Sequence, residues 1–151
     1  MKKFFAAVSL IALMIFSGCG ENPQATSAEI KESAPIKNLV TIQVNGKNFS
    51  ATLEDNPTAR AFVERLPLEV DMQELNGNEK YFYLDNDLPS DSVSVKQIHA
   101  GDLMLFGSNC VVLFYKDFAT SYSYTRLGKL DNPNDLAKIL GGGNVRVKFA
   151  K

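Results

Sequence analysis

Alternation of apolar and polar residues is the dominant pattern of the chain from residue 39 onward. The segments 39–44 (LVTIQV) and 47–53 (KNFSATL) each alternate, which predicts two half-buried β-strands. Asn45 and Gly46 lie between them, and both residue types tolerate a positive φ. A tight hairpin is therefore predicted here. Further strands are predicted at 68–75, 79–84, 93–98, 102–106, 110–115, 121–128 and 144–149.

Two short stretches show a helical pattern. In the first, Asn56 can cap a helix, Pro57 suits its first turn and Pro67 ends it. Its apolar residues follow the spacing i, i+3, i+4 and i+7, which gives one apolar stripe. These residues are Ala59, Phe62, Val63 and Leu66. The second stretch, 131–143 (DNPNDLAKILGGG), ends at glycines that accept a left-handed C-terminal conformation.

The number of strands favours closure of the sheet. Eight or nine short strands exceed what one open sheet comfortably holds, and a barrel has no exposed edges. We predict a mainly β fold, a closed eight-stranded β-barrel formed by residues 39–151. The two helices would cover the two ends of the barrel, where their apolar stripes find a partner. A domain of this size can bury a core without disulfides or metal.

The first 38 residues have a different character. Lys2 and Lys3 precede an apolar run too short for a comfortable membrane span, which needs about 20 residues. Residues 1–18 are therefore predicted to be a signal peptide rather than a transmembrane helix. Residues 19–38, which begin at Cys19, are polar and lack a hydrophobic period, so we expect a flexible tether.

The residues before Cys19 (FSGC) resemble the lipobox of bacterial lipoproteins. The resemblance implies that the leader is cut before Cys19 and that Cys19 carries lipid, palmitate included. The membrane would then be a partner through this N-terminal lipid. It implies a place in the cell envelope, on the outer membrane or on the outer face of the plasma membrane. Cleavage by an ordinary signal peptidase is the alternative.

Cys110 is the second of the two cysteines and lies in the apolar segment 110–114 (CVVLF). A lipidated Cys19 could not pair with it, so Cys110 would be a single thiol in an exported protein. We expect a buried, unreactive side chain. A nucleophile would need a histidine, and the one histidine, His99, comes without an orienting motif.

Charge and composition point away from several functional classes. The formal net charge is −1, from 16 basic and 17 acidic residues, so we expect no nucleic-acid partner. Asp85, Asp87 and Asp91 lack the spacing of an EF-hand, and one His without a Cys pair does not make a zinc site. We therefore predict neither a metal site nor a cofactor.

Five segments of the predicted barrel are VNGKNFSATLEDNPTARAFVERLPL, NEKYFYL, AGDLMLF, VVLFY and SYSYTRLGKL. Together they resemble the small bacterial and archaeal cyclophilin-like proteins, and the resemblance extends from about Leu39 to Phe149. It implies a closed barrel of about eight strands with two helices. True cyclophilins isomerise X-Pro bonds with an arginine in a Phe-His-Arg motif. This chain has no such motif and no Trp.

Tyr122, Tyr124 and Arg126 alternate, so they share one face of a predicted strand, and Tyr115 ends the strand before it. Aromatic rings beside a guanidinium can bind a carbonyl or a carboxylate. We predict that Tyr115, Tyr124 and Arg126 line a ligand groove, with Tyr124 and Arg126 in one environment. An outer barrel face with no ligand is the alternative.

A second candidate site is a pair of carboxylates, Glu79 and Asp102. The two could act together as acid and base, but capping of turns is favoured for both.

Three functions remain open from the sequence. The first is a membrane-tethered barrel that binds a small molecule or peptide without catalysis. The second is an enzyme, a divergent peptidyl-prolyl isomerase acting on exported proteins. The third is a structural or partner-docking lipoprotein. No catalytic residue is predicted.

Overall fold

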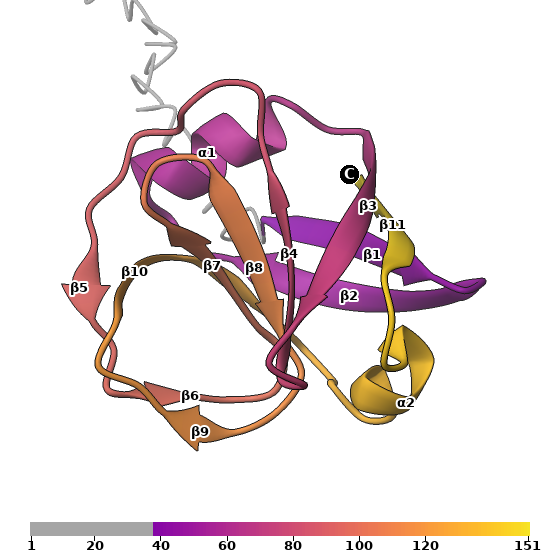
Figure 1. Ribbon diagram of the computed structural model, residues 1–151. Coiled ribbons are helices and arrows are strands. Elements are labelled where there is room, and N and C mark those ends of the chain that lie inside the picture. Colours follow the sequence, from indigo (N-terminus) through magenta and orange to yellow (C-terminus); the bar gives the residue numbers. More distant parts are fainter. Residues whose placement is uncertain (1–37) are drawn as a thin grey trace, which may run out of the picture. The chain divides into compact units, whose positions relative to one another are not determined.

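A computed structural model describes residues 38–151 (Figure 1). The two helices are α1 (Pro57–Val63) and α2 (Leu136–Leu140). The first six strands are β1 (Leu39–Val44), β2 (Lys47–Leu53), β3 (Leu68–Leu75), β4 (Glu79–Tyr83), β5 (Val93–Ser94) and β6 (Gln97–Ile98). The other five are β7 (Asp102–Phe106), β8 (Cys110–Phe114), β9 (Phe118–Ala119), β10 (Ser123–Leu130) and β11 (Val145–Ala150).

Eight of these strands form a closed antiparallel ring. The order around the ring is β2-β1-β11-β3-β4-β8-β7-β10, and pairing of β10 with β2 closes it. β5 adds to β10 outside the ring, and β6 pairs with β9 as a separate ribbon. The predicted mainly β fold, a closed eight-stranded barrel with two short helices, is confirmed.

The first hairpin forms at the predicted turn. Asn45 and Gly46 both have positive φ, 48° and 77°, as a two-residue turn matched to strand twist requires. β1 and β2 pair in full register on either side, from Val44 with Lys47 to Leu39 with Thr52. Asn76 and Gly77 also have positive φ, 55° and 68°, in the three-residue connection between β3 and β4.

Asn56 fixes the start of α1. Its side-chain oxygen accepts a hydrogen bond from Ala59 N at 2.8 Å, and Pro57 follows in the first turn. Its side-chain nitrogen donates to the Arg126 carbonyl at 2.8 Å, so one residue caps the helix and ties it to β10. The helix ends at Val63, earlier than Pro67 had suggested.

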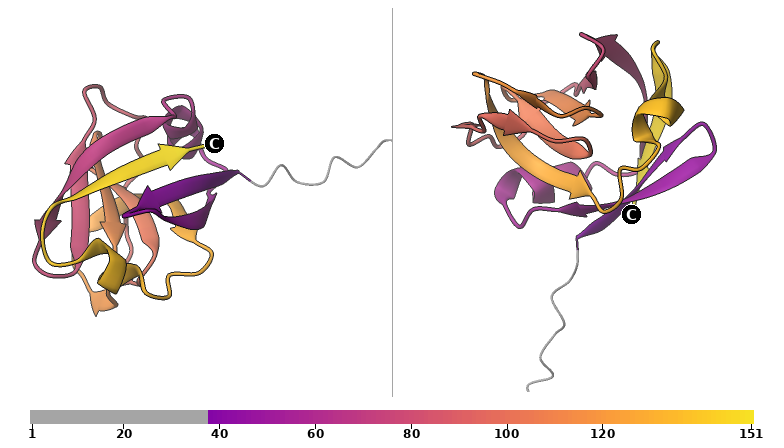
Figure 2. Two further views of the ribbon diagram at one scale, coloured as in Figure 1. Left: turned by 90° about the vertical axis from the view of Figure 1, so that its right-hand side faces the viewer. Right: turned by 90° about the horizontal axis from the view of Figure 1, so that it is seen from below.

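α2 is shorter than its sequence suggested. It begins at Leu136, after Asp135 in a left-handed conformation, and ends before Gly141, whose φ is 65°. Leu136 and Leu140 are buried in the same cluster as Phe62 of α1. The two helices lie toward opposite ends of the barrel (Figure 2).

Side chains fill the inside of the barrel. The alternation of β8 places Val111, Leu113 and then Tyr115 in the interior cluster. Cys110, Val112 and Phe114 of the same strand belong to a second cluster on the outer face. Both faces of β8 are buried, which explains why this segment is apolar throughout instead of alternating.

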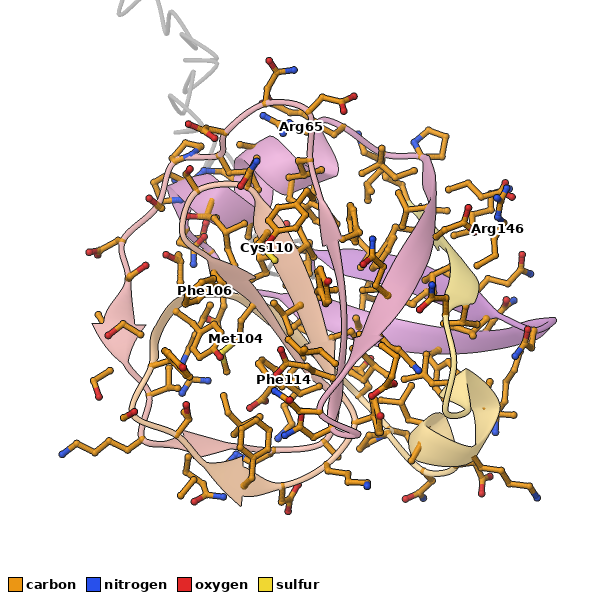
Figure 3. The ribbon with its side chains drawn as sticks, viewed as in Figure 1. Arg65, Met104, Phe106, Cys110, Phe114 and Arg146 are labelled. Atoms are coloured by element: carbon orange, nitrogen blue, oxygen red, sulfur yellow. The ribbon has the colours of Figure 1, made fainter. Side chains whose placement is uncertain are left out.

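The second cluster lies between the barrel wall and the small β6–β9 ribbon. Met104 and Phe114 come from the barrel wall, while Ile98 comes from β6 and Phe118 packs against the cluster from β9 (Figure 3). This cover was not foreseen. The sequence suggested one strand over 93–98, but Lys96, with φ of 60°, divides it into β5 and β6.

The barrel is closed by the pairing of β10 with β2 at Gly128. β2 and β10 meet through three residue pairs, and Gly128 lies opposite Leu53. A Cβ at Gly128 would lie 2.5 Å from the Thr52 carbonyl oxygen and 2.8 Å from the Leu53 Cα. Opposite Leu103 of β7 the register shifts between Arg126 and Gly128, a β-bulge that turns β10 toward β2.

The predicted signal peptide, the lipidated Cys19 and most of the tether lie outside the described residues. Between residues 38 and 151, no helix is long and apolar enough to cross a membrane.

We predict that Gly128→Ala destabilises the barrel by about 3 kcal/mol, because the new methyl group meets rigid backbone of β2. Thermal unfolding followed by circular dichroism measures the effect. Gly142→Ala is the matched control, since a Cβ at Gly142 has no neighbour within 4 Å. Equal melting temperatures for the two variants would show that the contact between β2 and β10 tolerates a side chain at residue 128.

Candidate functional site

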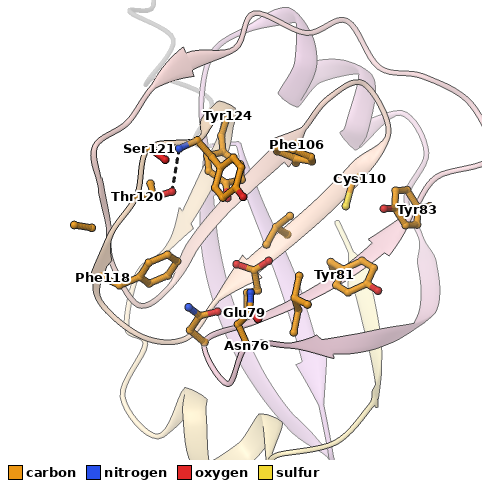
Figure 4. A pocket seen from close by; sticks show the side chains of 15 residues that line it. Asn76, Glu79, Tyr81, Tyr83, Phe106, Cys110, Phe118, Thr120, Ser121 and Tyr124 are labelled. Carbon is orange, nitrogen blue, oxygen red and sulfur yellow. Dashed lines mark hydrogen bonds between the residues drawn. The ribbon is translucent and has the colours of Figure 1, made fainter.

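A pocket of about 470 Å³ opens on the outer face of the barrel (Figure 4). Its volume lies in the range of small-molecule sites. Three groups of residues line it. β3, β4 and the turn between them contribute Leu75, Asn76, Asn78, Glu79, Tyr81 and Tyr83. β7 and β8 contribute Phe106, Cys110 and Val112. β9, β10 and the residues between them contribute Phe118, Ala119, Thr120, Ser121, Tyr122 and Tyr124.

The floor and walls follow from strand alternation. On β4, Phe82 faces the barrel interior, so its neighbours Tyr81 and Tyr83 face outward. On β8, Cys110 and Val112 form the floor beside them. The segment from Phe118 to Tyr122 forms the opposite wall, and the Thr120 hydroxyl accepts a hydrogen bond from Tyr122 N at 3.1 Å (Figure 4).

Aromatic side chains gather around this pocket. Four of the five tyrosines of the chain line it, together with two phenylalanines. Phe106 contacts Tyr122 edge-on and Tyr124 at a tilt, with ring centroids 6.0 Å and 5.6 Å apart. Of the six exposed large hydrophobic residues in the described part of the chain, four line the pocket: Leu75, Tyr83, Phe106 and Tyr122. Contiguous exposed apolar surface of this kind is typical of binding sites.

Glu79 is the one acidic residue among the pocket-lining residues. Its carboxylate lies between the Phe118 wall and the Tyr81 wall (Figure 4). Burial raises the pKa of this carboxyl group, and the negative charge of Glu74 adds to the shift. Within residues 38–151, no hydrogen bond or ion pair engages the Glu79 side chain. Its charge is therefore left without a protein partner.

Asn78, next to Glu79, also lines the pocket. Its side-chain oxygen is the one buried side-chain polar atom of the described residues that has no hydrogen-bond partner. A buried acceptor left unpaired costs about 1–3 kcal/mol. Two neighbouring residues that line the pocket therefore carry acceptors without a donor from the described residues: the buried Asn78 amide oxygen and the half-buried Glu79 carboxylate.

The pocket leaves Cys110 unsuited to nucleophilic chemistry. The side chain is only 5% exposed. Burial raises the pKa of the thiol to about 11, with a contribution from the charge of Glu79. The thiol is therefore protonated at neutral pH, and a thiol is a poor nucleophile.

The family follows from a comparison with known families. The model of the cyclophilin-like family matches residues 42–150, which is nearly all of the barrel. The chain belongs to this family. A comparison with curated proteins gives no match.

Among solved structures, the cyclophilin-like barrel is similar to the solution structure of a hypothetical protein from Archaeoglobus fulgidus. The TM-score is 0.51 at 16% sequence identity, over 74% of this chain and 92% of the archaeal one. At this identity the likeness concerns the fold alone. The pocket must therefore be interpreted from its own residues.

The cyclophilin-like barrel does not bring the three predicted ligand residues together. Tyr124 lines the aromatic pocket. Arg126 lines a separate hollow of about 270 Å³, beside Pro57, Pro89 and other residues. Tyr115 lines a third hollow next to α2. That these residues bind a ligand stays a prediction, but no single groove contains all of them.

The expectation of one environment for Tyr124 and Arg126 is wrong, although they share a face of β10. Tyr124 is buried, in contact with Phe114 at a ring-centroid distance of 5.5 Å, whereas Arg126 is exposed. The reason is the outer cluster, in which Tyr124 packs with residues of the β6–β9 ribbon. Alternation along a strand predicts the face of the sheet to which each side chain points. It does not predict which of the outward-facing side chains are covered by another segment.

Tyr115 belongs to an internal network instead. Its hydroxyl lies 2.8 Å and 2.9 Å from the two Glu74 carboxylate oxygens and donates to this carboxylate. Lys80, fully buried, pairs with Glu74 and donates to the Gly141 and Gly143 carbonyls at 2.8 Å and 2.6 Å. Burial acts to raise the pKa of Glu74, but the bonds from Lys80, Tyr115 and Gly77 N outweigh it and lower the pKa.

Glu79 and Asp102 do not form a catalytic pair. They lie on β4 and β7, and β8 runs between these strands, so their backbones are roughly 10 Å apart across two strand spacings. The Asp102 carboxylate accepts a hydrogen bond from His99 N at 2.9 Å and caps a turn, as favoured. Glu79 instead enters the pocket. The described residues contain no group of three or more His, Cys, Asp or Glu that could hold a metal.

Sequence analysis missed Tyr81, Tyr83 and Phe106 as pocket residues. The signal for the two tyrosines was present, because they alternate with Phe82 and Leu84 on one strand. An aromatic face on the outside of a barrel was the clue. Phe106 had no comparable signal, since it ends an apolar strand.

We predict that Cys110 resists alkylation in the native protein. Incubation with iodoacetamide at pH 8 should leave the Cys110 peptide unmodified, because the thiol is buried and its pKa is about 11. Mass spectrometry of this peptide measures the labelling, and unfolding in guanidinium should make it complete. Rapid labelling without denaturant would restore Cys110 as a reactive thiol.

Proposed function

We propose that this cyclophilin-like barrel is an envelope-anchored lipoprotein that binds a small molecule or peptide, without catalysis. The aromatic pocket on the outer face is the proposed binding site. Cys19 is the proposed point of lipid attachment. The observation that carries the binding role is the set of four tyrosines and two phenylalanines around a cavity of about 470 Å³.

The character of the pocket supports binding over a purely structural role. Exposed aromatic groups cost solubility and bring no internal stability, so a surface that keeps them is expected to have a partner. The closed barrel leaves its interior filled with side chains. A ligand is therefore accommodated on the outer wall.

The proposal of a non-catalytic role rests on the pocket's chemistry. Among the described residues that line it, none is Lys, Arg or His. Prolyl isomerisation by true cyclophilins uses an arginine, and the nearby Arg126 lies in a different hollow. The alternative, a divergent isomerase, is tested by an NMR exchange assay on X-Pro peptides. Acceleration that a pocket variant abolishes would favour the enzyme.

Anchoring is supported by the sequence alone. The basic residues, the apolar run and the SGC tripeptide before residue 20 match a lipoprotein leader. A lipid on Cys19 would hold the barrel at the outer membrane or at the outer face of the plasma membrane. The polar residues 20–38 would separate the pocket from the lipid surface.

We predict that Ser121→Trp abolishes ligand retention, because an exposed rim residue is replaced by an indole that occupies the pocket. The full-length protein, purified in a non-ionic detergent, is analysed by native mass spectrometry for a bound molecule. The wild type should retain one and the variant should not.

Ser90→Trp is the matched control, because Ser90 is an exposed serine that lines the Arg126 hollow. This variant should retain the bound molecule. Loss in Ser90→Trp with retention in Ser121→Trp would move the site to Arg126. Retention in both would reject both pockets.

We predict that Cys19→Ala prevents lipid attachment. The wild type should incorporate radiolabelled palmitate and fractionate with membranes. The variant should remain as unprocessed precursor or leave the membrane fraction. A wild-type protein that takes up no palmitate would contradict the anchoring part of the proposal, while leaving the pocket untouched.

A further inference from the structure

The pocket combines aromatic walls with a single negative charge. Tyr81, Tyr124 and Phe118 surround the end at which the Glu79 carboxylate lies (Figure 4). Aromatic faces carry partial negative charge and attract cations. A cation in this pocket would be attracted both by the aromatic faces and by the Glu79 carboxylate, whereas an anion would be repelled by both.

The groups around Glu79 contribute no positive charge. From β3 comes Glu74, whose own charge is matched by Lys80 on the inner side of the sheet. From β4, β8 and β10 come Tyr81, Cys110 and Tyr124, none of which can carry a positive charge. Burial raises the pKa of Tyr124 to about 12, and the Glu79 charge adds to that shift. No positive charge of the described residues therefore offsets the negative charge of the Glu79 carboxylate in this pocket.

The unpaired polar atoms at this end are acceptors. The Asn78 side-chain oxygen is buried and has no donor within residues 38–151. The Glu79 carboxylate is half-buried and has no donor within the described residues, so it favours a ligand that brings donors into this apolar pocket. An ammonium group brings up to three donors together with the missing charge.

Resting on the proposed function, that this pocket binds a ligand, we propose that the ligand is an organic cation. Its ammonium group pairs with the Glu79 carboxylate, and its apolar body lies against the tyrosine and phenylalanine side chains. The cavity of about 470 Å³ admits an arylalkyl amine or one basic side chain of a peptide.

Binding of matched probes to the full-length protein tests this assignment. Isothermal titration calorimetry in a non-ionic detergent compares 2-phenylethylammonium with 2-phenylethanol, which has the same size without the charge. We expect the ammonium compound to bind at least about tenfold more tightly, as a charge-assisted bond with cation–π contacts implies. 3-Phenylpropionate, an anion, should bind more weakly than either.

Two variants separate the charge from the shape of the pocket. Glu79→Gln keeps the shape and should bind both probes with the weak affinity of the alcohol. It should fold normally, because it removes a charge that burial disfavours. Glu64→Gln makes the same change at an exposed position at the end of α1 and should leave the tenfold preference unchanged.

A further probe, a lysine derivative that resembles one residue of a peptide, distinguishes two sources of the cation. Tighter binding of N-acetyl-lysine methylamide than of 2-phenylethylammonium would point to basic side chains of polypeptides, and the reverse order to free amines. Either order supports the inference. Equal affinities of the wild type for the ammonium and the alcohol would overturn it while the binding role stands. Binding of none of the four probes would reject this pocket, and the proposed binding function with it.

Discussion

The close approach of β10 to β2 at Gly128 is the constraint on which the barrel depends. The seam has only three residue pairs, and at Gly128 the strands come closer than any side chain permits. The bulge just before it places both Leu127 and Gly128 opposite Leu103 and bends β10 into reach of β2. Without this contact, β2 and β10 would be two exposed sheet edges, which invite pairing with other chains.

Closure determines where a ligand can bind. An eight-stranded barrel is just wide enough for its own side chains, and here a buried apolar cluster fills it, with Phe62 and Phe149 in edge-on contact at a ring-centroid distance of 5.7 Å. The proposed ligand is therefore assigned to the outer wall. The outer face of β8 forms part of this wall. The β6–β9 ribbon covers only part of that face, and the aromatic pocket lies beside the covered part.

Local signals predicted the barrel better than they predicted its surface. Asn45-Gly46, the Asn56 cap and the strand alternation each act over a few residues, and each was found where expected. The ribbon depends on a left-handed residue, Lys96, that no propensity favours, and on the pairing of Gln97 with Ala119 and of Ile98 with Phe118, residues far apart in the sequence. The site was missed for the same reason. Tyr124 and Arg126 face the same way, and only the fold of residues 95–122 separates their surroundings.

Lys80 and Glu79 are neighbours on β4, but within residues 38–151 only the Lys80 side chain has charged and polar partners. Lys80 faces inward, and the fold surrounds it with Glu74 and two glycine carbonyls, so its three donors are all used. Glu79 faces outward into aromatic surroundings and receives no partner within the described residues. Burial of a lone charge costs stability, and the surroundings of Lys80 show that this fold can pair one completely. Glu79 avoids most of that cost because it is only half-buried and stays in reach of water, and its free carboxylate is the group on which the proposed cation site rests.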